Sequence, residues 1–330
     1  MAVTAATTMS YQSVDAPVMT LTSDNFDGTV EIDLEAPRSV EGWGVYARAA
    51  ALAITDALPP TPRGLRGHVA GRLPGSGLSS SASVTLAYLT AIADVNEVSL
   101  PPVAMAQMAL SAERDFVGVK VGILDPAAIV GSKRDHLLWI DSRDIRFEPV
   151  ALGEKAPPWQ ILVAYSGVRR NLLGTPYNDR VEECHGAARK LADWSGATDV
   201  RGLHDFSDEV YETFRYRLRD SEAKRARHFF SERARVRAGV ERWREGDIEG
   251  FGELMNASCH SSIENWESGS PELIELQRTL ERTAGVYGSR FSGAGFGGSV
   301  VALVEDADAV ARVLPVEAFR VESDDGVRIL

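Results

Sequence analysis

Residues 74–82 (PGSGLSSSA) combine residue types that can bind an anion. Gly75 and Gly77 allow backbone conformations and close approaches that a Cβ atom would block. Three consecutive serines follow, just before a predicted helix, whose first N–H groups can bind phosphate. A serine hydroxyl can also ligate Mg²⁺. No lysine stands where Walker A requires one, so the segment is either another kind of phosphate loop or a turn with N-cap serines.

A second glycine-rich segment lies near the C-terminus, at residues 292–298 (SGAGFGG). Four glycines in seven residues indicate a backbone that passes close to another group. That group is a ligand or the first glycine loop, and a tight hairpin explains the segment equally well.

Two carboxylates twelve positions apart, Glu113 and Asp125, are candidates for chemistry. Glu113 falls near the end of a predicted helix, and Asp125 begins the next element after Gly122. One carboxylate beside a phosphate site can hold Mg²⁺, and another beside a sugar hydroxyl can accept its proton. Taken singly, each would be interpreted as a solvated acid. Their combination with both glycine loops favours a functional interpretation.

The surrounding sequence predicts the elements that position these residues. Alternation and turn residues predict a β-hairpin at 18–34, and apolar periodicity predicts several helices. The predicted helices are 44–58, 84–95, 101–117 and much of 178–250. Further strands are predicted before residue 74, at 137–140 and 160–165, and on both sides of the second glycine segment, ending near Val304. Residues 156–158 (APP) are the best candidate domain boundary.

Composition excludes several classes of protein. The 330 residues are 44% hydrophobic and 25% charged, which is typical of a globular protein large enough for two domains. A net charge of −12 argues against nucleic-acid binding. The basic run 224–228 (KRARH) lies among acids and is interpreted as a solvated helix face. Cys184 and Cys259 form no CxxC pair, and no apolar run has membrane-spanning length, so we expect a cytoplasmic protein with reduced thiols.

The two glycine segments together resemble a known family. Residues 74–82 resemble the second signature of the GHMP kinases (galactose, homoserine, mevalonate and phosphomevalonate kinases), and residues 289–298 (SRFSGAGFGG) resemble the third. Residues 122–125 (GILD) are similar to the catalytic-aspartate motif of galactokinases, and residues 177–180, 225–228 and 252–256 to weaker galactokinase blocks. The resemblance extends from about Ser23 to Val304.

That resemblance implies an α+β protein with the GHMP kinase fold. Residues 1–155 would form the ATP-binding N-terminal domain, which is ribosomal protein S5 domain 2-like, without its first strands. Residues 156–330 would form the ferredoxin-like C-terminal domain.

The resemblance also implies roles for individual residues. Asp125 would be the catalytic base facing the sugar hydroxyl, Tyr177 would hydrogen-bond the sugar, and Ser81 and Glu113 would hold Mg²⁺. The residues expected to bind ATP are Ser23, Gly75, Ser76, Gly77, Leu78, Ser79, Ser80, Ser81, Arg169, Gly293 and Gly295.

The implied activity is that of a sugar 1-kinase, which transfers the γ-phosphoryl group of ATP to the anomeric hydroxyl of galactose or a related sugar. The alternatives are a kinase for arabinose or N-acetylgalactosamine, and a catalytically inactive sensor or binding protein on the same fold. The expected partners are the sugar and MgATP, with no nucleic acid and no membrane, and the expected state is a monomer or weak dimer.

The sequence departs from the family in one large and two small ways. Nothing in it resembles the family's N-terminal motif GRVNLIGEHTDY, which supplies an arginine and an acidic sugar clamp. Either the chain starts at an internal methionine or the loss is natural. We expect MgATP binding to persist, galactose binding to be weak and turnover to fall at least ~10³-fold. Pro126 stands where galactokinases usually have Gln, and Val121 stands where many have Cys. Both lie near Asp125, which leaves the identity of the sugar open.

Overall fold

The structure, a computed structural model, describes residues 1–71, 78–168 and 176–330. The chain divides into two compact units. The first contains nearly all described residues up to Val150 together with Glu322–Leu330, and the second contains Ala151–Val321. No helix within these ranges is long and apolar enough to cross a membrane.

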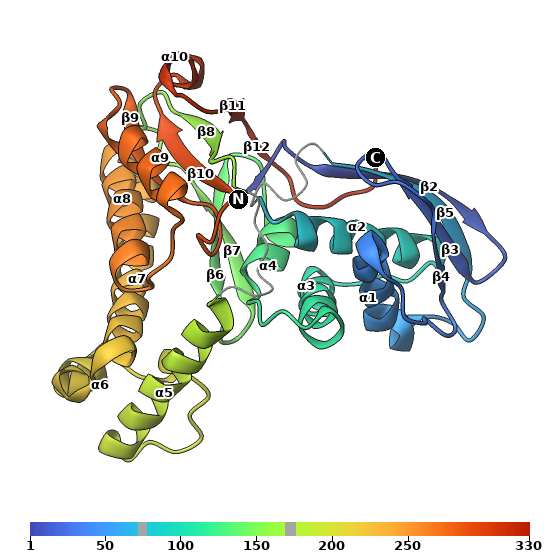
Figure 1. Cartoon of the computed structure of the whole chain (residues 1–330), viewed down its shortest axis with the longest axis horizontal. Helices are drawn as coiled ribbons and strands as arrows, with labels where there is room; N and C mark the ends of the chain where they lie inside the picture. The colour runs from blue at the N-terminus through green and yellow to red at the C-terminus, as the bar shows by residue number, and fades with distance from the viewer. Residues whose placement is uncertain (72–77, 169–175) are drawn as a thin grey trace. The chain divides into compact units, whose positions relative to one another are not determined.

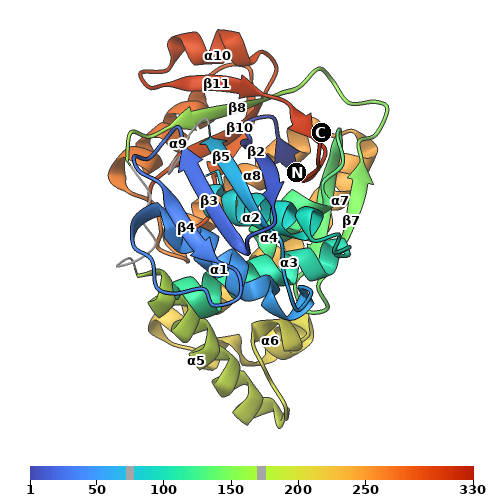
Figure 2. The ribbon, with the colours of Figure 1, turned by 90° about the vertical axis from the view of Figure 1, so that its right-hand side faces the viewer.

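The first unit is built on a mixed four-stranded sheet with the order β2-β5-β3-β4. Its strands are β2 (Thr7–Val14), β3 (Val18–Ser23), β4 (Val30–Asp33) and β5 (Gly64–Gly71). Strands β3 and β4 pair antiparallel, which confirms the predicted hairpin, while β3 and β5 run parallel. Helices α1 (Val45–Ile54) and α2 (Ser80–Val95) cover one face (Figures 1 and 2). Fully buried Met19, Leu21 and Leu86 lie in the core between sheet and helices.

Three further helical elements follow in this unit. Helix α3 (Pro102–Ser111) runs directly into a π-helical turn, η3 (Ala112–Val117), and α4 (Leu124–Gly131) follows. Helices α2, α3 and α4 contact one another, and both α2 and α3 contact η3. Short 3₁₀ turns, η1 (Gly42–Gly44) and η2 (Thr55–Ala57), flank α1 and extend it close to the predicted 44–58. Strands β6 (His136–Asp141) and β7 (Arg146–Ala151) form a separate ribbon.

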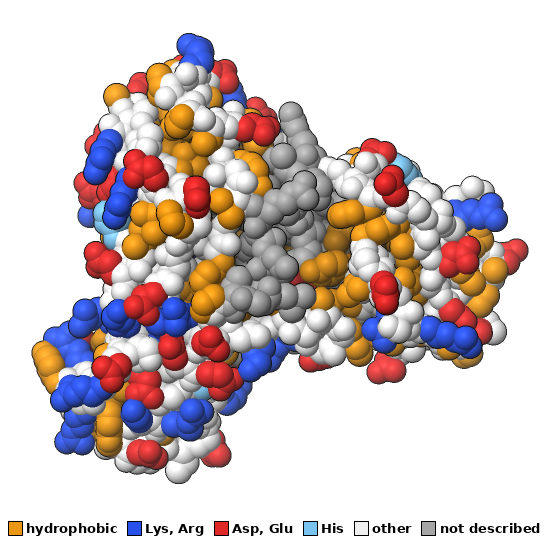
Figure 3. All heavy atoms as spheres, in the orientation of Figure 1, with side chains coloured by type: hydrophobic (Ala, Val, Ile, Leu, Met, Phe, Trp, Pro, Cys, Tyr) orange, Lys and Arg blue, Asp and Glu red, His pale blue; other side chains and the backbone are white. Residues whose placement is uncertain are grey.

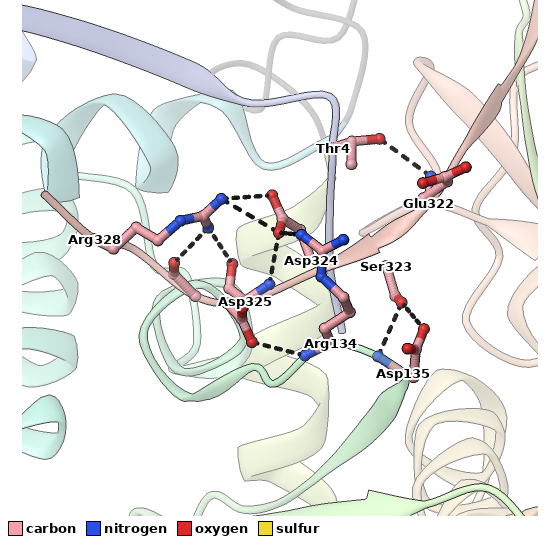
Figure 4. A network of polar contacts seen from close by, with 9 residues as sticks. Thr4, Arg134, Asp135, Glu322, Ser323, Asp324, Asp325 and Arg328 are labelled. Carbon is pink, nitrogen blue, oxygen red and sulfur yellow. Dashed lines mark hydrogen bonds and ion pairs between the residues drawn. The ribbon is translucent and has the colours of Figure 1, made fainter. Parts of the chain in front are cut away.

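The last nine residues of the chain return to the first unit (Figure 4). There β12 (Ser323–Asp324) pairs antiparallel with β1 (Ala2–Val3). The Arg134 and Arg328 guanidinium groups both contact the carboxylate of Asp324, at 2.8 and 3.1 Å. Ser323 Oγ donates a hydrogen bond to Asp135 and accepts one from the Asp135 backbone N–H. Apart from the local Arg328–Asp324 pair, these contacts join residues about 190 or about 320 positions apart in the chain.

The second unit contains an antiparallel sheet with the order β11-β8-β10-β9. Its strands are β8 (Gln160–Tyr165), β9 (Val286–Phe291), β10 (Ser299–Val304) and β11 (Ala318–Val321). Three helices share its core: α8 (Ile248–Glu264), α9 (Pro271–Arg282) and α10 (Ala307–Val313). Side chains of alternating residues in β8 and β10, such as Leu162, Ala164, Val300 and Ala302, pack against Leu276 and Leu280 of α9.

A second core in this unit joins three more helices, α5 (Tyr177–Ser195), α6 (Asp208–Phe214) and α7 (Asp220–Glu245). Turns η4 (Leu203–Asp205) and η5 (Arg215–Arg217) connect them. Cationic and anionic side chains are interspersed on the surface around α5 and α6 (Figure 3). The basic run 224–228, which the sequence predicts to be a solvated helix face, lies on α7. That prediction is wrong at Arg225, whose side chain is fully buried.

Candidate functional site

Helix α2 begins at Ser80, four residues before the predicted start at Val84. Ser79 precedes it in the left-handed conformation (φ 56°), and its carbonyl accepts a hydrogen bond from the Ser83 N–H at 2.9 Å. The Ser79 side chain forms no N-cap hydrogen bond. The N–H groups at a helix start, here including that of Ser81, point out of the helix and can bind an anion. Leu78 lies just before this turn, and Gly75, Ser76 and Gly77 fall outside the described residues.

Ser23 is the last residue of β3, the strand next to β5. Its hydroxyl accepts the Asn25 N–H at 3.1 Å, and the Asn25 side-chain oxygen accepts the Gly71 N–H, also at 3.1 Å. The turn after β3 therefore fixes the end of β5, the strand that precedes the predicted phosphate-binding segment.

Glu113 is 4% exposed and lies in the π-helical turn η3. Its carbonyl accepts hydrogen bonds from the N–H groups of both Gly118 and Val119, at 3.0 Å each. Gly118 has a φ of 89°, which glycine adopts at little cost and which ends the helix. Isolated π turns inside helices are frequent at functional sites, because they redirect side chains. The turn thus places a buried carboxylate on an element that contacts α2.

Asp125 occupies the first turn of α4 and is half-buried. The helix dipole favours a carboxylate in that position. The preceding residue, Leu124, is 60% exposed. Since α2 contacts both η3 and α4, the elements that carry Ser81, Glu113 and Asp125 are neighbours within the first unit.

A magnesium ion fits this set of donors. The described residues contain no group of three or more His, Cys, Asp or Glu side chains that would enclose a metal ion. Mg²⁺ is commonly bound through one or two protein oxygens together with substrate phosphates and water. A serine hydroxyl and one buried carboxylate, beside a helix N-terminus suited to phosphate, match that pattern.

The second glycine segment connects β9 and β10 in the second unit. Gly293 and Gly295 have φ values of 71° and 80°, a conformation that L-residues rarely adopt. At the end of the segment, the Gly298 N–H donates to the Val168 carbonyl at 2.9 Å, and the Gly298 carbonyl accepts bonds from Ser166. The segment is therefore attached to the residues just after β8.

Tyr177 is the first residue of α5 in the same unit, and Arg169 falls outside the described residues. The structure brings Ser81, Glu113 and Asp125 onto neighbouring elements of the first unit. It places Tyr177, Gly293 and Gly295 in the second.

The structure also contains two polar groupings that the sequence analysis did not identify as groupings. In the first unit, the two ring nitrogens of His68 contact Thr22 Oγ1 and Asp24 Oδ1, both at 2.9 Å. In the second unit, the fully buried Arg225 contacts two glutamates. Arg225 falls in a block that resembles galactokinases, which is the one available pointer to it.

Comparisons with known proteins define the class to which this arrangement belongs. Residues 45–133 match the family model of the GHMP kinases N terminal domain, and residues 237–318 match that of the GHMP kinases C terminal domain. The chain is 36% identical over 284 residues to a galactokinase of Roseiflexus sp. (strain RS-1), and the alignment covers 86% of this chain and 69% of that protein. The chain belongs to the GHMP kinase family.

Within that family the chain is similar to galactokinases and to a uronic-acid kinase. It is 42% identical over 275 residues to a galacturonokinase of Arabidopsis thaliana, covering 82% of this chain and 65% of that protein. The crystal structure of Lactococcus lactis galactokinase complexed with galactose aligns with a TM-score of 0.89 at 28% identity, over 99% of this chain and 88% of that chain. A mevalonate kinase structure aligns at 17% identity with a TM-score of 0.65, which supports the fold alone. The predicted α+β GHMP kinase fold is confirmed.

Proposed function

We propose that this chain is a sugar 1-kinase that transfers the γ-phosphoryl group of MgATP to the anomeric hydroxyl of galactose or a close relative. The observation that carries the proposal is the structural similarity to a galactokinase over 99% of the chain. The neighbouring elements that present Ser81, Glu113 and Asp125 support it, because they offer an anion-binding helix start, a metal-binding carboxylate and a base within one unit.

In this proposal the nucleotide phosphates bind residues 75–81 and the N–H groups that begin α2. Ser81 and Glu113 hold Mg²⁺, which neutralises charge on the phosphates when it is bound. Ser23, Arg169, Gly293 and Gly295 complete the expected nucleotide contacts. The α2 N-terminus supplies positive potential where other kinases use a P-loop lysine.

Asp125 acts as the base. Its carboxylate accepts the proton of the anomeric hydroxyl while the hydroxyl oxygen bonds to the γ-phosphorus and the bond to the β-γ bridging oxygen breaks. The products are a sugar 1-phosphate and ADP. Tyr177 orients the sugar through its hydroxyl group. Most of the acceleration comes from positioning and from charge stabilisation, as in phosphoryl transfer generally.

A uronic acid is the second candidate substrate, and the 42% identity to a galacturonokinase favours it. Galacturonate differs from galactose by a carboxylate in place of the C6 hydroxymethyl group. A site that pairs with the carboxylate discriminates strongly against the neutral sugar, because a buried charge of the site would be left unpaired.

ADP release coupled to NADH oxidation, measured with separate sugars, tests the proposal. The panel is galactose, galacturonate, arabinose and N-acetylgalactosamine, and the control is ATP without sugar. We expect sugar-dependent ADP release that is highest for galactose or for galacturonate. MgATP binding by calorimetry without sugar-dependent ADP release would contradict kinase activity and favour the inactive sensor.

A further inference from the structure

The loop between α8 and α9, residues 265–270, is held in an unusual conformation by a cluster of charges. Glu267 has a φ of 55°, in the left-handed region that non-glycine residues rarely adopt. Its carboxylate contacts Lys224 Nζ at 2.5 Å, Arg225 Nη2 at 2.6 Å and Arg180 Nη2 at 3.8 Å. Such strained residues persist where surrounding contacts determine the conformation, and they are concentrated at functional sites.

Arg225, on α7, joins this loop to α5. The side chain is fully buried, and its Nε donates to Glu183 Oε2 at 2.6 Å. Its Nη1 donates to the backbone carbonyl of Asn265. Arg180 adds two contacts to the same Glu183 carboxylate, at 3.2 and 3.3 Å. Arg180 and Glu183 lie three and six residues after Tyr177, so the cluster fixes the beginning of α5.

The other side of the loop packs against the second glycine segment. A Cβ atom on Gly295 would lie 2.8 Å from Ser268 Oγ and 2.7 Å from Phe291 Cδ2. A Cβ atom on Gly269 would lie 2.6 Å from a side-chain carbon of Ile274. Ser268 is itself buried, and its hydroxyl donates to the Ser262 carbonyl at 3.3 Å. The loop is therefore in close contact with the backbone of residues 292–298.

We propose that Glu267 and Arg225 are positioning residues, which hold the 265–270 loop so that Tyr177 and the 292–298 glycine segment keep one fixed arrangement. The inference rests on the proposed function, in which those two features contact sugar and nucleotide. Arg225 is the fully buried member of the cluster, whereas the Glu267 side chain is 38% exposed. Ion pairs around a buried charge seldom stabilise a protein more than apolar residues of the same volume, but they can specify one geometry. Arg225 uses three donor nitrogens to three partners, a pattern that lysine cannot reproduce.

Glu267→Gly separates positioning from stability. Glycine adopts φ 55° without strain, so the loss of the carboxylate contacts is offset by relief of the backbone. The matched control is Lys190→Met, which breaks the Lys190–Glu222 pair (2.5 Å) between the same two helices, α5 and α7, away from the loop. Glu267→Asp serves as the conservative variant, because it retains a carboxylate and aspartate tolerates the left-handed region.

The first readout is the steady-state kinetics of each variant beside its melting temperature. For Glu267→Gly we expect kcat/KM for the sugar to fall about 10- to 100-fold through both kcat and KM, because small misplacements of reacting groups are costly. Glu267→Asp should recover part of that loss, and Lys190→Met should stay within about twofold of wild type. Unchanged kinetics in Glu267→Gly, with or without a lower melting temperature, would overturn the inference.

Amide hydrogen exchange gives a second readout that needs no activity. Three backbone amides report on the arrangement. The Arg180 N–H donates to the Pro176 carbonyl, the Ser292 N–H to the Ser299 carbonyl, and the Gly298 N–H to the Val168 carbonyl. We expect them to exchange about tenfold faster in Glu267→Gly and to be unchanged in Lys190→Met. Wild-type exchange rates in Glu267→Gly would overturn the inference. If the wild-type chain phosphorylates no sugar, the proposed kinase function is refuted. The hydrogen-exchange rates would then decide by themselves whether Glu267 and Arg225 hold the start of α5 and the 292–298 segment in place.

Discussion

Replacement of Asp125 by asparagine removes a base while leaving the helix that carries it nearly undisturbed. The residue lies in the first turn of α4, where losing the charge forfeits about 0.3–1 kcal/mol of interaction with the helix dipole. A domain with a stability of about 5–15 kcal/mol stays folded after such a loss. Any large effect on turnover must therefore come from the chemistry.

The expected kinetic effect is much larger than the effect on stability. A positioned general base contributes about 10²–10⁴-fold, which corresponds to about 3–5 kcal/mol of transition-state free energy. We expect Asp125→Asn to lower kcat by that factor and to leave MgATP affinity within a few-fold, since the carboxylate is expected to face the sugar and not the nucleotide.

Transfer of label from [γ-³²P]ATP to sugar measures this effect even at low rates, and calorimetry measures MgATP affinity. The control is Asp308→Asn, the same chemical change in the first turn of α10, where no proposed site residue lies. It should keep wild-type turnover. If Asp125→Asn retains more than a tenth of wild-type kcat, the assignment of Asp125 as the base is wrong.

Three further predictions concern the metal ligand, the second glycine segment and the charged loop. Glu113→Gln should weaken the use of MgATP, with partial rescue at high Mg²⁺, and a magnesium titration of activity that matches wild type would argue against a ligand role. Gly295→Ala should lower the free energy of unfolding in urea by about 1–3 kcal/mol, because the new Cβ atom would lie 2.7 Å from Phe291 Cδ2 and alanine is strained at φ 80°, and an unchanged midpoint would contradict this packing. Lys224 and Arg225 lower the pKa of Glu267 from 4.5 to about 2, so its stabilising contribution is complete above pH 4.5 and is lost as the pH falls toward 2. Glu267→Gln should therefore lose less stability than wild type across that window, and parallel acid-unfolding curves would contradict the pKa assignment.

Local sequence signals predicted most elements that carry the candidate site. The apolar run in β8 has the predicted bounds, Gln160–Tyr165, and the hairpin of β3 and β4 follows its turn residues. Helix α2 starts at Ser80, earlier than predicted. Serine has only moderate helix propensity, so the local sequence did not indicate that Ser80 and Ser81 belong to the helix. The helix predicted at 101–117 contains a π turn around Glu113, which apolar periodicity does not reveal.

Contacts between distant residues could not be predicted in this way. The pairing of β1 with β12 joins the two ends of the chain, and no local pattern specifies it. Arg225 lies in a run that we interpreted as a solvated helix face, yet its side chain is fully buried. Its partners Glu183 and Glu267 are each 42 positions away, so charge pattern along α7 alone could not identify it as internal.

The identity of the phosphorylated product tests the central proposal most directly. Incubating the chain with MgATP and ¹³C-labelled galactose or galacturonate, and recording ³¹P and ¹³C spectra, reports which sugar carbon bears the phosphate. We expect a phosphate on the anomeric carbon and a matching amount of ADP, with both forming at least about 10²-fold more slowly in Asp125→Asn. ADP formed without a sugar phosphate, or a phosphate on any other carbon, would contradict assignment as a sugar 1-kinase.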